Sequence, residues 1–138
     1  MMWKEKYRIG VPLIDEQHEE LFRRVSAFIE TVQSQGDWDS KLEKVKETLA
    51  FMQEYVVSHF NDEEAFQEQI NYPDIENHKQ SHVQFKDAVA VYANRFENEG
   101  LNEELVQEFG GKLVTWLILH VAATDQKLGQ FVKSKEEE

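Results

Sequence analysis

The sequence predicts an all-α protein: an up-down-up-down four-helix bundle with an N-terminal arm, in a single domain. Apolar residues recur at steps of three and four along four long stretches, which is the spacing of one helical face. Short connections with glycine, proline or asparagine separate these stretches, and no alternating strand pattern of useful length competes with them. We expect the arm over residues 1–14 and the helices over about 15–34, 39–69, 74–98 and 102–131.

The arm contains Gly10 and Pro12, which favour irregular backbone, and two aromatic anchors, Trp3 and Tyr7. The helical pattern begins at Asp15, and the first helix has one apolar face. That face consists of Leu21, Phe22, Val25, Phe28, Ile29 and Val32.

Ser34–Gly36 ends the first helix, and Asp37 or Asp39 can cap the second. Pro73 breaks the chain after the second helix, because the residue before a proline is pushed away from the α region. Asp74 then caps the third helix. We interpret its aromatic residues as core rather than as an electron-transfer path; they are Phe85, Tyr92 and Phe96.

The fourth helix begins at Asn102, where Glu103 and Glu104 give the acidic first turn that favours a helix start. Gly110 and Gly111 lie inside this helix, and each costs up to about 1 kcal/mol there relative to alanine. Two interpretations stay open: close packing against a neighbouring helix, or a kink near the functional site. After about residue 131 we expect a polar, frayed tail.

The amino-acid composition excludes several classes of partner and of metal site. The 138 residues include 27 acidic and 15 basic side chains, for a net charge of −12, so we expect no nucleic acid or membrane as a partner. There is no cysteine, which excludes disulfides, thiolate zinc sites and iron–sulfur clusters. The first residues lack the apolar core of a signal peptide, and we therefore expect a cytoplasmic protein.

The histidines carry the strongest functional signal. All five belong to one spacing pattern: His18, His59, His78, His82 and His120. Glu63 follows the second of them by four residues, and Asp125 follows the last by five. Imidazole is a common metal ligand and carboxylates can bridge two cations. Seven donors are too many for one zinc ion, which usually takes about four ligands, and the pattern indicates a dinuclear site.

Helical phase supports a common centre. Residues four apart share a helix face, so His59 can enter the bundle with Glu63, and His78 with His82. Five residues instead place His120 and Asp125 about 140° apart. We therefore predict a π-bulge or similar distortion between them. His18 lies on the apolar stripe of the first helix, where a lone histidine is more often a hydrogen-bonded core residue than a ligand.

These residues resemble the hemerythrins, helical-bundle proteins that bind dioxygen at a non-haem di-iron centre. The resemblance rests on the histidine pattern, including the segment His59-Phe60-Asn61-Asp62-Glu63, and on flanking segments such as Ile14-Asp15-Glu16-Gln17-His18 and Trp116-Leu117-Ile118-Leu119-His120. The flanks, with Trp3, Tyr7 and Gly10, are similar to the bacterial branch. The resemblance covers the chain from Trp3 to about Phe131.

The resemblance implies the cofactor and the roles of its ligands. His78, His82 and His120 would hold one iron, and His18 and His59 the other. Glu63 and Asp125 would bridge the two irons with an oxo or hydroxo group, which leaves one position open for dioxygen on the second iron.

The expected walls of the dioxygen pocket are Leu21, Phe60, Trp116, Leu117 and Val121. Each of these also fits ordinary core packing. The family usually has isoleucine after the fourth-helix histidine, and the shorter Val121 could admit water and hasten oxidation. We expect Glu64 to be a solvated neighbour of the site rather than a ligand.

The predicted function is reversible dioxygen binding for storage, delivery or scavenging, without enzymatic activity. The alternatives are an oxygen, redox or nitric oxide sensor, a di-iron enzyme that reduces peroxide or nitric oxide, and an iron store. An oxygen-using enzyme or a signalling protein would be the partner. The iron itself follows from the resemblance, because manganese, cobalt or zinc accept many of the same donors.

Overall fold

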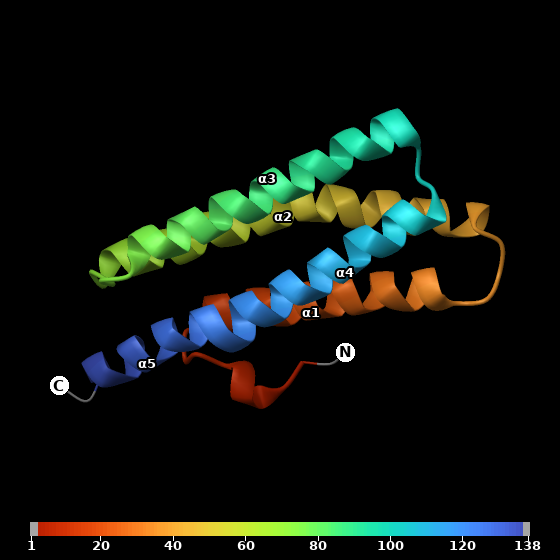
Figure 1. The fold of residues 1–138 in the computed structure, drawn as a ribbon. Helices are drawn as coiled ribbons and strands as arrows, with labels where there is room; N and C mark the ends of the chain where they lie inside the picture. The colour runs from red at the N-terminus through yellow and green to blue at the C-terminus, as the bar shows by residue number, and fades with distance from the viewer. Residues whose placement is uncertain (1–2, 137–138) are drawn as a thin grey trace.

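The computed structural model describes residues 3–136, and these form an antiparallel helical bundle (Figure 1). The four columns are α1, α2, α3 and a composite of α4 and α5 joined by a π-helical turn, η3. Their bounds are Pro12–Gln33 for α1, Leu42–Gln69 for α2, Ile75–Glu99 for α3, Glu103–Leu119 for α4, His120–Thr124 for η3 and Asp125–Glu136 for α5. No strand occurs within this part of the chain. The predicted all-α bundle is confirmed.

The arm is shorter than the sequence suggested, because α1 begins at Pro12 rather than near residue 15. Proline suits the first helical position, where its fixed φ is already helical and its missing N–H has no partner to lose. The Asp15 carboxylate accepts hydrogen bonds from the backbone N–H groups of Ile9 and Gly10, at 2.7 and 3.2 Å. Asp15 thus fixes the end of the arm to the first turn of α1.

Of the residues expected to cap the helices, only some make a capping hydrogen bond. Asn102 caps α4, where its side-chain oxygen accepts from the Leu105 N–H at 2.8 Å. Asp37 instead accepts a hydrogen bond from the N–H of Ser40, within the short 3-10 turn η2 (Asp39–Lys41). Neither Asp37 nor Asp39 caps α2 itself, which begins one turn later. Asp74 precedes α3, but its side chain makes no capping hydrogen bond to the helix.

The two central glycines of α4 differ in their surroundings. A Cβ atom added to Gly110 would lie 3.1 Å from a methyl of Ile29 and 3.2 Å from the ring of Phe28. An added Cβ on Gly111 would have no neighbour within 4 Å. Close packing against α1 therefore accounts for Gly110, and not for Gly111.

The arm packs onto the end of the bundle that carries α5 (Figure 1). Ile9 belongs to a small second core, whose other buried members are Ile14, Tyr72 and Leu128. A Cβ atom added to Gly129 would lie 2.9 Å from the Cβ of Ile9, so only glycine permits this approach. The last helix continues to Glu136, beyond the end predicted near residue 131, and residues 137–138 of the expected tail lie outside the described residues.

Between residues 3 and 136, no helix combines the length and the apolar character needed to cross a membrane.

Candidate metal centre

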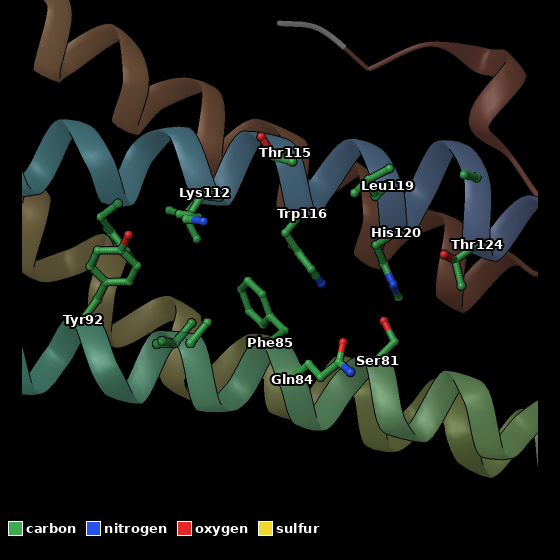
Figure 2. A pocket seen from close by; sticks show the side chains of 15 residues that line it. Ser81, Gln84, Phe85, Tyr92, Lys112, Thr115, Trp116, Leu119, His120 and Thr124 are labelled. Atoms are coloured by element: carbon green, nitrogen blue, oxygen red, sulfur yellow. The ribbon is translucent and has the colours of Figure 1, made fainter.

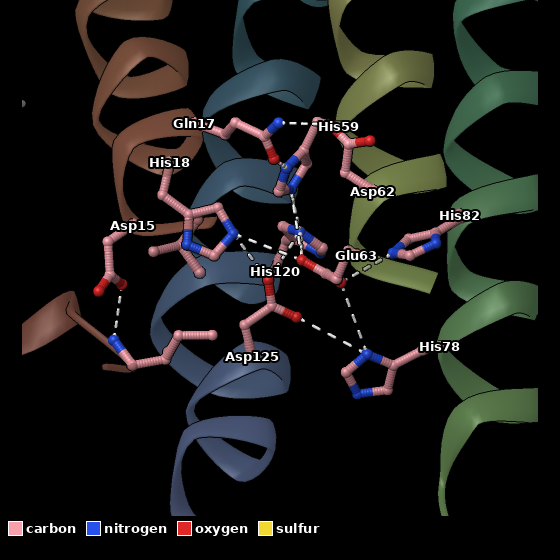
Figure 3. A network of polar contacts seen from close by, with 12 residues as sticks. Asp15, Gln17, His18, His59, Asp62, Glu63, His78, His82, His120 and Asp125 are labelled. Carbon is pink, nitrogen blue, oxygen red and sulfur yellow. Dashed lines mark hydrogen bonds and ion pairs between the residues drawn. The ribbon is translucent and has the colours of Figure 1, made fainter. Parts of the chain in front are cut away.

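The structure brings all seven predicted donors together in the interior of the bundle (Figure 3). His18 comes from α1, while α2 contributes His59 and Glu63 from adjacent turns of one face. His78 and His82 enter in the same way from α3. His120 opens the π-helical turn and Asp125 begins α5. Each of the seven side chains is at most 2% exposed, so together they form a buried polar cluster.

The π-helical turn brings His120 and Asp125 onto the same side of the helix, although a regular helix would not. The Asp125 N–H donates to the carbonyl of His120, five residues earlier, so the turn contains one residue more than an α-helical turn. This insertion places His120 Nε2 only 2.9 Å from Asp125 Oδ2. The carbonyl of Val121 accepts from the side-chain amide of Gln126 at 3.1 Å. The distortion predicted between His120 and Asp125 is confirmed.

The Glu63 carboxylate lies between two groups of histidines. Its Oε2 atom is 3.4–3.6 Å from the Nε2 atoms of three of them: His59 at 3.4 Å, His120 at 3.5 Å and His18 at 3.6 Å. Its Oε1 atom faces the two histidines of α3, at 3.2 Å from His82 Nε2 and 3.7 Å from His78 Nδ1. The two oxygens of one carboxylate therefore serve opposite sides of the cluster.

Asp125 divides its oxygens in the same way. Its Oδ2 atom lies 2.8 Å from His18 Nε2 and 2.9 Å from His120 Nε2, while Oδ1 lies 3.7 Å from His78 Nδ1. Two groups with potential for metal binding result. The first comprises His18, His59, Glu63, His120 and Asp125, and the second comprises Glu63, His78 and His82.

The grouping differs from the expected one in the place of His120. Its Nε2 atom lies 3.3 Å from His59 Nε2, on the side of the first group, whereas the resemblance assigns it to the iron of His78 and His82. His120 is also close to the second group, because its ring centroid is 5.5 Å from that of His82. The three-plus-two division of the histidines stays a prediction.

The cluster has more acceptors than the protein alone can satisfy. Glu63 Oε2 and Asp125 Oδ1 are buried without a hydrogen-bond partner, and Asp125 Oδ2 faces only the ring nitrogens of His18 and His120, at 2.8 and 2.9 Å. Leaving such groups unpaired in a protein interior costs about 1–3 kcal/mol each, and more when they are charged. Several acceptor atoms point toward one small volume, where they could bind a cation. The mixture of imidazole and carboxylate suits first-row transition metals such as iron.

Without a metal ion, a proton on His120 supplies part of the positive charge that the two carboxylates attract. Burial opposes charge on His120, but the carboxylates of Asp125 and Glu63 outweigh it and raise its pKa to about 10. Burial likewise opposes the ionised form of Glu63, yet the surrounding histidines, His120 first, hold its pKa well below the usual value. Burial lowers the pKa of His59 well below its usual value. The cluster thus keeps ionised carboxylate beside a neutral imidazole, as metal ligation requires.

Three further side chains contact ring nitrogens of the histidines, and two of them, Gln17 and Gln67, were not singled out from the sequence. His59 Nδ1 donates to Gln17 Oε1 at 2.7 Å, and the amide nitrogen of Gln17 donates to Asp62 at 2.7 Å. The Gln67 amide lies 2.7 Å from His78 Nδ1. Gln67 follows Glu63 by four residues, a spacing that could have indicated it.

The third of these side chains is Glu64. His82 Nδ1 donates to its Oε2 atom at 2.7 Å, and the Glu64 side chain is 22% exposed. As expected, Glu64 touches solvent and lies outside both groups of candidate ligands. Its hydrogen bond to the buried His82 was not predicted.

The residues expected to wall the dioxygen pocket divide into two kinds. Four are completely buried core residues: Leu21, Phe60, Leu117 and Val121. Trp116 instead is half-buried and stacks on the His120 ring, with centroids 4.9 Å apart and planes at 13°. It lines a largely apolar groove of about 450 Å³ between α3 and α4, and the inner wall of this groove includes His120 (Figure 2). Of the seven clustered residues, His120 alone lines this groove.

Comparison with known proteins agrees with this geometry. Residues 9–132 match the hemerythrin HHE cation binding domain. A bacteriohemerythrin of Clostridium acetobutylicum is 27% identical over 126 residues, which cover 91% of this chain and 96% of that protein. A bacteriohemerythrin of Stenotrophomonas maltophilia is 28% identical over 97% of this chain and 82% of its own length. Myohemerythrin-1 of Phascolopsis gouldii is 27% identical over 91% of this chain and 89% of its own.

Proposed function

The chain belongs to the hemerythrin family, and we propose that it binds dioxygen reversibly at a non-haem di-iron centre. The observation that supports this most strongly is the arrangement of Glu63, whose two oxygens face different groups of histidines. A carboxylate placed in this way can join two cations. The division of the Asp125 oxygens supports the same arrangement.

In this proposal the seven clustered side chains are the ligands. As the family resemblance implies, His78, His82 and His120 would hold one iron and His18 and His59 the other, and Glu63 and Asp125 would be shared between them. With this division one iron would have fewer protein ligands than the other, and dioxygen would bind on that side. When bound, the iron pair supplies the two electrons that dioxygen takes up on binding and returns on release.

The donor set favours carriage over oxidation chemistry. Five imidazoles and two carboxylates carry less negative charge than the carboxylate-rich sites of ferritin-like di-iron proteins, which use about four carboxylates and two histidines. Fewer anionic ligands favour the ferrous state and disfavour high-valent iron.

The surrounding residues act by keeping water away. Phe60 and Val121 are completely buried next to the cluster, so protons from solvent have no direct path through this wall. The groove beside Trp116 offers a small apolar molecule such as dioxygen a route to the edge of the centre. The cytoplasmic location and an oxygen-using or signalling partner stay predictions.

The test is to load the protein anaerobically with ferrous iron and to record optical spectra after rapid mixing with dioxygen. We expect two irons per chain and a visible absorption band that forms on mixing and disappears under vacuum, over repeated cycles. The same protein loaded with zinc is the control and should give no band. Rapid irreversible bleaching with consumption of peroxide would instead support an enzyme or a redox sensor.

A further inference from the structure

The far ring nitrogens of the five histidines have different partners. That of His59 donates to the neutral amide of Gln17. That of His78 is Nε2, which is buried without a hydrogen-bond partner, while the Gln67 amide contacts the Nδ1 atom that faces the cluster. The Nδ1 atoms of His18 and His120 are buried without a hydrogen-bond partner. His82 differs from all four, since its Nδ1 donates to a carboxylate. The polar environment of the cluster is therefore unequal on its two sides.

The ring of His82 is held from two directions. Phe60 stacks on it with a centroid separation of 3.9 Å and an interplanar angle of 10°. This stacking restricts rotation of the imidazole ring. Glu64 Oε2 receives the Nδ1 proton at 2.7 Å. With Nδ1 protonated, the lone pair of Nε2 faces the cluster, where Glu63 Oε1 lies 3.2 Å away. Ring plane and tautomer are thus both fixed.

We propose that Glu64 is a positioning residue that makes the two metal positions electronically unequal, an inference that rests on the proposed di-iron function. A carboxylate behind an imidazole increases the basicity of the ligating nitrogen, whereas a neutral amide does so less. The metal bound by His82 is therefore the more electron-rich of the two and loses an electron first. Gln17, behind His59, leaves the metal on that side with the weaker donor.

The chain offers a closely matched pair of variants. Glu64→Gln keeps an oxygen that can accept the Nδ1 proton, and it removes the negative charge. Glu68→Gln removes the same charge from the same helix one turn further on, where Glu68 is exposed and pairs with Lys79 at 3.0 Å. Comparison of the two separates the contact with His82 from the change in net charge.

Two measurements test the proposal. Spectroelectrochemical titration of the iron-loaded protein gives the potentials of its two one-electron steps. Competition with a chelator gives the affinity of the metal-free protein for Co²⁺, without any redox chemistry. For Glu64→Gln we expect Co²⁺ affinity about tenfold weaker at one of the two sites. The first oxidation should shift upward by about 59 mV, the equivalent of a tenfold change in the ferric-to-ferrous affinity ratio. Glu68→Gln should shift neither.

A reciprocal variant covers the case in which Glu64→Gln fails to fold. Gln17→Glu places a carboxylate behind His59, and it should bring the two potentials closer together. Unchanged potentials and Co²⁺ affinities in either folded variant, in a protein that still binds two irons and dioxygen, would overturn the role of Glu64 alone. Wild-type protein that fails to bind two irons would overturn the proposed function instead.

Discussion

His120 Nε2 and Asp125 Oδ2 lie 2.9 Å apart although a regular helix would point the two side chains about 140° apart. One π-helical turn makes the contact possible, and its irregular backbone is supported from outside. The Gln126 amide donates to Val121 O at 3.1 Å, within the turn, and to Tyr7 O at 2.9 Å, in the arm. This one side chain thus hydrogen-bonds both the arm and the turn that follows His120.

The first prediction concerns this connection. Gln126→Ala leaves two carbonyls without their donor, and a hydrogen bond of this kind contributes about 1 kcal/mol to stability. We expect the free energy of unfolding to fall by about 1–2 kcal/mol in chemical denaturation. Gln130→Ala, on an exposed position of the same helix, is the control and should change little. Equal stability of the two variants would show that Gln126 does not support the turn.

The two glycines of α4 give opposite predictions. Gly110→Ala forces a methyl group against Ile29 and Phe28, and such overpacking costs about 1–3 kcal/mol. Gly111→Ala meets no atom and should stabilise the helix by up to about 1 kcal/mol. Thermal unfolding of both variants checks the pair. A stabilising Gly110→Ala would contradict the close packing of α4 on α1.

The raised pKa of His120 predicts how the stability of the metal-free protein depends on pH. Its pKa is about 10 in the fold against 6.5 as the ordinary value. The charged imidazole therefore stabilises the fold fully below pH 6.5, and this contribution disappears as the pH rises toward about 10. Denaturation at a series of pH values should show this loss, and His120→Gln should flatten it. An unchanged pH profile in the variant would be inconsistent with the pKa shift.

Metal binding has the opposite dependence on pH, because a cation must displace the proton of His120. We expect Co²⁺ affinity to increase from pH 6 to pH 9, with release of protons that calorimetry in buffers of different ionisation enthalpy can count. Affinity that is independent of pH over this range would mean that His120 does not ligate.

Val121 is completely buried beside His120 and is one methylene smaller than isoleucine. Val121→Ile should fill space next to the centre and exclude water, so that the dioxygen-bound protein oxidises several-fold more slowly. The decay of the visible band in air measures this. Val121→Ala is the matched variant and should oxidise faster; equal rates in all three proteins would contradict the role of this wall.

The sequence predicted which side chains gather in the buried cluster, because helical periodicity determines which side chains share a face. His59 with Glu63, and His78 with His82, followed from a spacing of four, and the spacing of five in His120 and Asp125 was sufficient to predict the π-turn. Such reasoning depends only on the chain's local geometry. The start of α1 at Pro12 was missed because Gly10 and Pro12 equally suit an irregular arm.

The partners behind the histidines were not predictable in the same way. Gln17 and Glu64 are each adjacent in sequence to an expected ligand, and polar residues at such positions more often face solvent. Their hydrogen bonds to His59 and His82 depend on how α1 and α3 pack against α2, which spacing along one helix does not reveal.

The most direct test of the account is a crystal structure of the iron-loaded protein, with anomalous scattering measured at the iron edge. We predict two anomalous peaks, with one oxygen of Glu63 bound to each and His82 and His18 on opposite irons. A single peak, or a peak that does not contact Glu63, would contradict the bridged two-iron centre.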